Sequence, residues 1–249
     1  MHVVRSLPSK LSCRCSFHGV DVVIVLVGSG LVAVSAAQSL LDRGYHVMLI
    51  TAHAEFGFPH GGCGLWDTSM LDWPLDTLEE AVAAQVNETV TCRSQWLVKR
   101  LVHRFTAAGG RTSTRVRLQS IDNHLHATGT GTFPLDDVHH VILADQDVPE
   151  PAPGTGEPLL TFIASQTWYG AVVAEGTTVD APHTGQRGDG SVEVWTTEQS
   201  ELDAIQPFTL ESMRMNWDVE EAPINAARSV LRAQAAVNDF LVSGRLGEA

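Results

Sequence analysis

The chain has 249 residues, of which 44% are hydrophobic and 18% are charged. Its 29 acidic and 16 basic residues give a formal net charge of −13, which excludes a protein that tracks nucleic-acid phosphates. No apolar run reaches the roughly 18 residues of a membrane-spanning helix, so only a peripheral membrane contact stays open. Four cysteines are too few for a disulfide scaffold, and the length is sufficient to bury a hydrophobic core.

Residues 1–19 differ in composition from the rest of the chain. They are rich in serine, contain Arg5, Lys10 and Arg14, and hold no acidic residue. A basic, serine-rich and acid-poor segment is typical of an organelle-targeting peptide. The alternative is an unstructured N-terminus on a cytoplasmic protein, and the cytoplasm is the location that we expect.

The first regular elements predicted are a strand, a helix and a second strand. Residues 20–27 form a run of mainly β-branched residues with Asp21 as its one polar member, which is typical of a strand buried on both faces of a parallel sheet. Residues 31–43 carry leucine and valine with small alanines between them, and Gly44 follows where a glycine commonly ends a helix. Residues 46–51 form a second short apolar run. Together these segments predict the βαβ unit of a Rossmann-like α/β fold with a mostly parallel sheet.

The turn between the first strand and the helix matches the dinucleotide fingerprint G-x-G-x-x-G/A at Gly28, Gly30 and Ala33. Gly28 permits the tight turn, Gly30 lets the backbone approach a pyrophosphate, and Ala33 lets the helix pack against the strand. We therefore predict a dinucleotide site that includes these residues and Ser29. The alternative is a glycine-rich turn that holds no ligand.

The end of the second strand departs from this fingerprint. An acidic residue there normally binds the ribose of the adenosine, but the position is occupied by Thr51. Thr51 is expected to make a weaker, single contact with the ribose, and Glu55, four residues later, is the alternative that could reach back to it. No arginine stands nearby in the sequence to bind a 2′-phosphate, so NADP is disfavoured.

The remaining segments predict the rest of a two-part molecule. A glycine- and aromatic-rich loop is expected over residues 55–73. Helices are predicted over residues 75–86 and 93–107, and strands over 115–121, 124–130 and 138–144. Residues 167–175 and 191–197 alternate like antiparallel strands, and residues 223–242 form an amphipathic helix.

The segment 149–158 is rich in proline and glycine, which marks a domain boundary. The predicted organisation therefore has four parts: an N-terminal segment over 1–19, a dinucleotide-binding domain over 20–148, a small antiparallel β-rich substrate or cap segment over 149–222, and a C-terminal helical segment over 223–249 that packs back on the first domain.

Five segments, taken in chain order, share one pattern: VDVVIVLVGSGLVAVSAAQSLLDRGYHVMLI, EFGFPHGGCGLWD, CRSQWLVKRLVHRFTAAGGRTSTRVRLQSID, DDVHHVILADQD and SQTWYGAVVAE. They resemble, in order, the N-terminal unit, the loop near the flavin, the arginine-led helix, the second FAD-contacting strand and the start of the substrate sheet of one family. This family comprises FAD-binding proteins of the geranylgeranyl reductase and lycopene cyclase type. The resemblance covers residues 20–175.

The resemblance implies FAD as the cofactor, with NAD less expected, and an oxidoreductase acting on an apolar or isoprenoid-like small molecule. It also implies that Arg93 pairs with a phosphate or ribose of the cofactor. Ala144 and Asp145 are implied as the cofactor-contacting end of the second strand, and the loop from Gly57 to Trp66 is expected to lie over the isoalloxazine ring. A non-redox, flavin-dependent cyclase of the lycopene cyclase type is the alternative reaction.

Three departures from the family pattern favour a protein without catalytic activity. Gln146 stands where the family has a glycine, Thr51 replaces an acid, and the late Gly-Asp motif has no match beyond Gly188-Asp189-Gly190. We interpret that tripeptide as a hairpin turn, because Asp-Gly between alternating apolar residues is a strong turn signal. The competing hypothesis is a truncated or degenerate relative that binds nucleotide without catalysis.

Two residues of the loop are candidates for catalysis. Cys63 lies among glycines that could carry a thiol to a flavin or substrate, and His60 could donate a proton near neutral pH. The alternative for each is an ordinary loop residue. No metal site is expected, because His139 and His140 are neighbours in a strand and point to opposite faces.

Overall fold

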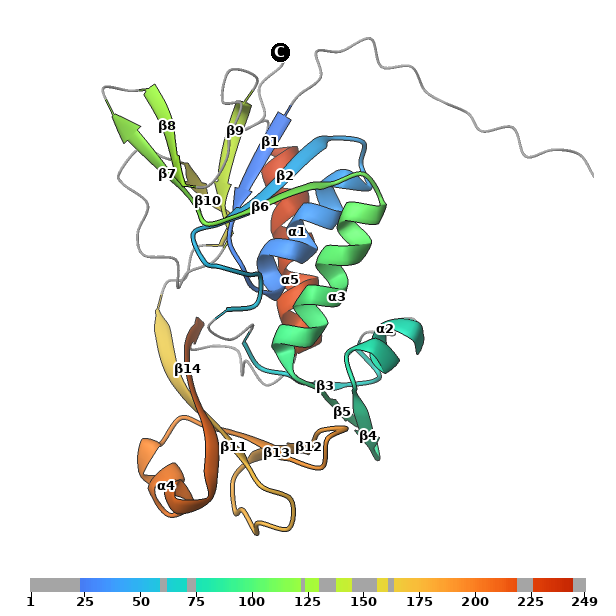
Figure 1. Ribbon diagram of the computed structural model, residues 1–249, viewed down its shortest axis with the longest axis vertical. Helices are drawn as coiled ribbons and strands as arrows, with labels where there is room; N and C mark the ends of the chain where they lie inside the picture. The colour runs from blue at the N-terminus through green and yellow to red at the C-terminus, as the bar shows by residue number, and fades with distance from the viewer. Residues whose placement is uncertain are drawn as a thin grey trace, which may run out of the picture.

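The computed structural model describes residues 23–58, 62–70, 75–121, 124–129, 138–144, 156–160, 164–218 and 226–243. Its upper half in Figure 1 is built on a five-stranded parallel sheet. The strand order is β10-β9-β1-β2-β6, and each neighbouring pair is parallel. The strands are β1 (Val23–Val27), β2 (His46–Thr51), β6 (Arg111–Thr114), β9 (Val138–Leu143) and β10 (Glu157–Pro158).

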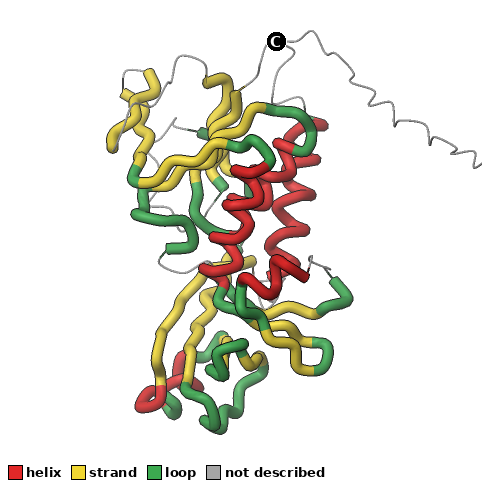
Figure 2. The backbone as a smooth tube through the Cα atoms, turned by 45° about the vertical axis from the view of Figure 1, so that its right-hand side comes forward, coloured by secondary structure: helices red, strands yellow, loops and turns green. Residues whose placement is uncertain are grey.

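Both faces of this sheet are covered, which explains the continuous apolar runs of β1 and β2. Three helices lie on one face, as Figure 2 shows: α1 (Leu31–Leu41), α3 (Ser94–Ala107) and α5 (Ala226–Val242). The hairpin of β7 (Val116–Ile121) and β8 (His124–Gly129) covers the other face. The sheet therefore separates two apolar clusters, and the helical cluster is much the larger.

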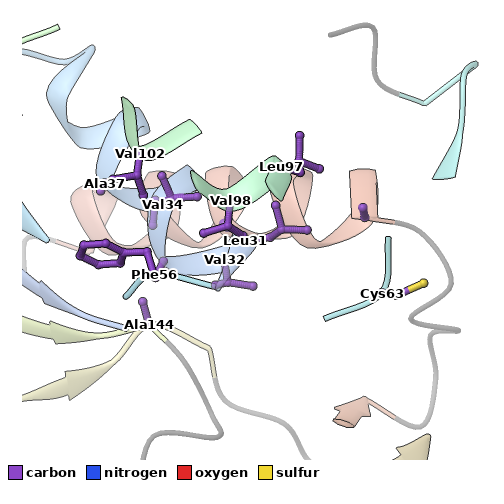
Figure 3. Close-up of a cluster of buried hydrophobic side chains, with 14 of the residues drawn as sticks. Leu31, Val32, Val34, Ala37, Phe56, Cys63, Leu97, Val98, Val102 and Ala144 are labelled. Atoms are coloured by element: carbon purple, nitrogen blue, oxygen red, sulfur yellow. The ribbon is translucent and has the colours of Figure 1, made fainter. Parts of the chain in front are cut away.

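Helix α1 is almost completely buried because its side chains are small. Ala33, Ala36 and Ala37 are inaccessible to solvent. Their size lets α3 and α5 pack against α1 while α1 packs against the sheet. Figure 3 shows Leu97 and Val98 of α3 beside the apolar residues of α1.

A second, antiparallel sheet has the strand order β12-β13-β11-β14. Its strands are β11 (Ser165–Val173), β12 (His183–Gln186), β13 (Val192–Thr196) and β14 (Thr209–Asp218), with α4 (Gln199–Asp203) and the 3-10 helix η1 (Gln206–Phe208) between the last two. One face packs under α4. The other face joins the main core through large side chains: Trp168, Trp195, Met213, Met215 and Trp217. The predicted β-rich segment is thus a sheet with one face packed into the main core.

A third, smaller sheet contacts β12 of the second sheet and helix α5, and sequence reasoning missed it. It contains β3 (Leu65–Asp67), β4 (Ala84–Val86) and β5 (Thr89–Thr91) in the order β3-β5-β4. The helix predicted over 75–86 is therefore wrong in its second half, since α2 (Leu75–Glu80) stops before β4. Val82 and Asn87 have positive φ angles, which end the helix and form the β4–β5 turn.

We predict that Gly170→Ala lowers the free energy of unfolding by about 1–3 kcal/mol through overpacking. A Cβ atom at Gly170 would lie only 2.9 Å from the ring of Trp195, which is fully buried. Urea denaturation followed by circular dichroism measures the change. Ser165→Ala at the exposed start of the same strand is the control, and equal stability of the two variants would contradict the prediction.

Candidate dinucleotide-binding site

The fingerprint turn lies where β1 meets α1, at the carboxyl edge of the parallel sheet. The Gly28 N–H donates to the carbonyl of Ile50 at 2.9 Å, which ties the turn to β2. Gly30 is the N-cap residue of α1, with φ −96°, and no side chain caps the helix. A helix N-terminus without a side-chain cap offers backbone N–H groups and a positive dipole end to an anion. The geometry of the turn thus suits a pyrophosphate.

The loop after β2 folds over this turn. The Gly57 N–H donates to the Ser29 carbonyl at 2.8 Å, and the Ser29 hydroxyl donates to the Phe58 carbonyl at 3.1 Å. Gly57 has φ +82°, and a Cβ atom there would lie 3.0 Å from the Cα of Gln95. A glycine is therefore required for the loop to pass between the turn and α3.

The residues expected at the ribose and at the second FAD-contacting strand are both buried. Thr51 ends β2, and its hydroxyl accepts a hydrogen bond of 3.2 Å from the His53 N–H. Ala144 follows β9, and its N–H donates to the carbonyl of Val27 at 2.9 Å. Figure 3 shows Ala144 near Val32 and Phe56. Asp145, Gln146 and His60 lie outside the described residues.

Arg93 is held by carboxylates of the antiparallel sheet. It is the N-cap residue of α3, and its Nη1 lies 2.5 Å from Oε1 of Glu211 on β14. Its Nε lies 3.5 Å from Oδ2 of Asp189. The predicted contact of Arg93 with a cofactor stays a prediction, and in this structure its guanidinium joins α3 to the second sheet.

A buried ion pair continues this network. The side chain of Glu193 is 0% exposed and that of Arg187 is 3% exposed. Oε2 of Glu193 accepts from Arg187 Nε at 3.0 Å and Nη2 at 2.5 Å. Oε1 accepts from the Gly64 N–H at 2.8 Å and from Trp195 Nε1 at 2.6 Å. Both carboxylate oxygens are thus satisfied, as a buried charge requires.

The tripeptide Gly188-Asp189-Gly190 forms the turn between β12 and β13, as interpreted from the sequence. The Gly190 N–H donates to the Arg187 carbonyl at 3.0 Å, and Gly190 has φ +85°. Asp189 accepts from the N–H and hydroxyl of Ser191. Partial burial raises the pKa of Asp189, but the Ser191 hydrogen bonds and the charges of Arg93 and Arg187 outweigh burial and lower it.

Cys63 is buried at the edge of the core, where Figure 3 draws it (purple and yellow). Burial raises the pKa of its thiol well above the usual value, and the negative charge of Glu193 raises it further. Burial and Glu193 also raise the pKa of Cys92. A protonated thiol is a poor nucleophile, so the environment of Cys63 favours a packing role.

Two arginines near the end of β2 were not foreseen. No arginine lies near Thr51 in the sequence, but β6 pairs with β2 and brings Arg115 beside its end. The Arg115 N–H donates to the His53 carbonyl at 2.8 Å. Arg115 and Arg117 line a hollow together with Ala52, the residue after Thr51.

The described residues contain no group of three or more His, Cys, Asp or Glu side chains that could hold a metal ion. Among the helices of the described part, none is long and apolar enough to cross a membrane.

The fold has clear counterparts among solved structures. A p-nitrophenol 4-monooxygenase from Pseudomonas putida DLL-E4 matches with a TM-score of 0.59 at 12% identity, over 91% of this chain and 81% of that one. A geranylgeranyl bacteriochlorophyll reductase-like protein from Thermoplasma acidophilum matches with a TM-score of 0.56 at 12% identity, over the same shares. The chain shares the Rossmann-like α/β fold of these structures. The predicted fold class is confirmed.

A third solved structure, a flavoprotein/dehydrogenase from Cytophaga hutchinsonii, matches with a TM-score of 0.50 at 12% identity, over 90% of this chain and 79% of that one. No protein-family model and no curated protein matches the sequence.

We predict that Glu193→Gln lowers the free energy of unfolding by about 3–5 kcal/mol, because the buried Arg187 guanidinium loses its closest charge partner and keeps only Glu211 at 3.7 Å. Chemical denaturation followed by circular dichroism measures the effect. The exposed residue Glu198 provides the matched control, and Glu198→Gln should change stability by less than about 0.5 kcal/mol. If Glu193→Gln lowers the free energy of unfolding no more than the control does, the Arg187–Glu193 ion pair is dispensable for stability.

The lowered pKa of Asp189 makes a prediction about acid stability. A carboxylate with a lowered pKa in the folded state stabilises the fold above its unfolded pKa, which is about 3.9, and this contribution disappears as the pH falls through the folded pKa. Asp189→Asn should therefore be less stable than the wild type near neutral pH and should lose less stability on acidification. Melting temperatures between pH 7 and about pH 3 measure this difference. The melting temperature of Asp203→Asn, a substitution at an exposed site, should change with pH in the same way as that of the wild type.

Proposed function

We propose that this chain binds FAD at the Gly28–Gly30 turn and acts as a flavin-dependent oxidoreductase on an apolar small molecule. The observation that carries the proposal is the position of this turn. The helix after β1 leads to β2 on one side, while β9 lies on the other side of β1. In open parallel sheets, ligands bind at the carboxyl edge where the strand order reverses in this way.

The residues present fit the pyrophosphate part of FAD better than the ribose part. Gly28 and Gly30 provide a close backbone approach, Ala33 lets α1 pack against the sheet, and the N-terminus of α1 has no side-chain cap. The Thr51 hydroxyl accepts a local hydrogen bond from the His53 N–H, and Thr51 has no carboxylate to bind the ribose. FAD, when bound, would supply the redox chemistry, and the chain would orient it and exclude water.

The apolar substrate in this proposal comes from the family resemblance. The inner face of the antiparallel sheet carries Trp168, Met213, Met215 and Trp217, and these side chains are buried in the main core. An isoprenoid substrate and a cytoplasmic location belong to this proposal, and a non-redox, lycopene cyclase-like reaction is the alternative to it. The reductase and monooxygenase names of the matched structures agree with a redox reaction.

A second candidate function is a nucleotide-binding relative without catalysis. The observation that favours it is the state of Arg93, whose guanidinium is engaged by Glu211 and Asp189. An arginine in this ion network has less freedom to bind a cofactor phosphate.

We predict that Gly30→Val abolishes retention of FAD, because a branched side chain at this position blocks the approach of the pyrophosphate to the turn. The flavin absorption bands of the purified protein, before and after incubation with added FAD, measure retention. Gly30→Ala adds only a methyl group and should lose less flavin.

Circular dichroism verifies that both variants are folded. A folded Gly30→Val protein with the flavin content of the wild type would place the site elsewhere. A wild-type protein that takes up no added FAD would contradict the flavin proposal and favour the non-catalytic relative.

A further inference from the structure

The carboxylate of Glu211 lies between two arginines, and it is much less buried than the other acid of that network. Its Oε1 is 2.5 Å from Arg93 Nη1, and its Oε2 is 3.7 Å from Arg187 Nη1. The Glu211 side chain is 39% exposed, whereas that of Glu193 is 0% exposed. Glu193 is therefore the fixed partner of Arg187, and the position of the Glu211 carboxylate is open to solvent.

The buried arginine keeps one donor that neither glutamate satisfies. The Nε and Nη2 atoms of Arg187 donate to Glu193. Its Nη1 atom is buried and has no hydrogen-bond partner among the described residues, because 3.7 Å to Glu211 is beyond hydrogen-bond range. A buried donor without an acceptor costs free energy. An oxyanion closer to Arg187 than the Glu211 carboxylate would recover that cost.

Arg93 supplies the second guanidinium, from the start of α3. Its Cζ lies 5.6 Å from the centre of the Trp96 ring, and Trp96 is exposed. Helix α3 begins after Arg93 without a side-chain cap, and the N-terminus of a helix favours negative charge nearby. The surroundings of Arg93 thus combine an affinity for an anion with an accessible aromatic surface.

The strand that carries Glu211 is irregular at this point. Val172 of β11 pairs with Glu211 and Val173 pairs with Thr209, so Leu210 is an extra residue in β14. A bulge of this kind disrupts the ladder locally and changes the direction of the neighbouring side chains. Leu210 itself is exposed, so burial does not fix the segment before Glu211. The Glu211 side chain can therefore turn toward solvent more easily than a side chain within a regular strand.

Charge decides which oxyanion fits between the arginines. The network contains two guanidinium groups and three carboxylates: Arg93, Arg187, Asp189, Glu193 and Glu211. Exchange of the Glu211 carboxylate for a ligand carboxylate leaves the charge between the arginines unchanged. A phosphate monoester carries a charge of about −1.5 to −2 at pH 7 and would add negative charge beside Asp189 and Glu193. A carboxylate is therefore favoured over a phosphate.

We infer that Arg93 and Arg187 form a binding site for the carboxylate of a small organic acid, and that Glu211 closes this site by occupying it. The exposed ring of Trp96 beside Arg93 suits an acid with an apolar body. Phosphate is the other source of an oxyanion for the same two guanidinium groups. The site needs no FAD, so it stands or falls separately from the proposed function.

Isothermal titration calorimetry of the full chain tests this site with three probes: benzoate, benzamide and inorganic phosphate. Glu211→Gln should bind benzoate about tenfold more tightly than the wild type, because the substitution removes the carboxylate that competes for the arginines. Benzamide has the same ring without the charge and should bind weakly to both proteins. Glu198→Gln removes an exposed acid elsewhere and should bind benzoate as the wild type does.

A second substitution assigns the gain in affinity to the arginines. Arg93→Gln in the Glu211→Gln background should return the benzoate affinity to the wild-type level or below. Arg93 is partly exposed, so this substitution leaves the buried Arg187–Glu193 pair in place, and circular dichroism verifies the fold. Arg111→Gln in the same background removes an exposed positive charge at the start of β6 and should retain the gain.

Three results would overturn the inference: equal benzoate affinity of Glu211→Gln and the wild type, a gain that survives Arg93→Gln, or equal affinity for benzoate and benzamide. Tighter binding of phosphate than of benzoate to Glu211→Gln would overturn the carboxylate as the ligand and support the phosphate source. Flavin uptake, measured separately by absorption, decides the proposed function, and neither result implies the other.

Discussion

The second sheet depends on a single buried carboxylate. Glu193 receives hydrogen bonds from three parts of the chain: Arg187 before the β12–β13 turn, Gly64 before β3, and Trp195 on its own strand. Desolvating a buried charge of this kind costs several kcal/mol, and hydrogen bonds to both carboxylate oxygens are needed to offset that cost. The three donors must therefore be in place together, and this requirement fixes the antiparallel sheet against the small sheet and its preceding loop.

The same charges set the chemistry of their neighbours. The negative charge of Glu193 adds to burial in keeping the thiols of Cys63 and Cys92 protonated. Glu211 lies between Arg187 and Arg93, 3.7 Å from the first and 2.5 Å from the second. Arg93 is thus part of the structure that positions the second sheet, and a cofactor phosphate would compete with Glu211 for its guanidinium.

The sequence predicts those features that depend on local pattern. The strand, glycine turn and helix up to Leu41 are encoded in consecutive residues, so their positions are found without tertiary information. The hairpin turn at Gly188–Gly190 is local in the same way.

Features that depend on pairing between distant segments are missed. β3, β4 and β5 are three residues long, too short to show a period. Arg115 reaches the end of β2 only because β6 pairs with β2, and β6 is a polar, four-residue strand. Glu193 stands out as an acid in an apolar strand, yet nothing in the sequence identifies Arg187 and Gly64 as its partners.

The burial of α1 has a consequence for the order of events in the cell. Helix α1 comes early in the chain, but α5, the last of the described elements, covers part of its surface. The small alanines of α1 bury little area by themselves and depend on this late partner. The glycine turn at the start of α1 can therefore reach its final packing only after α5 has left the ribosome. A nucleotide held there would therefore bind only after α5 has been synthesised.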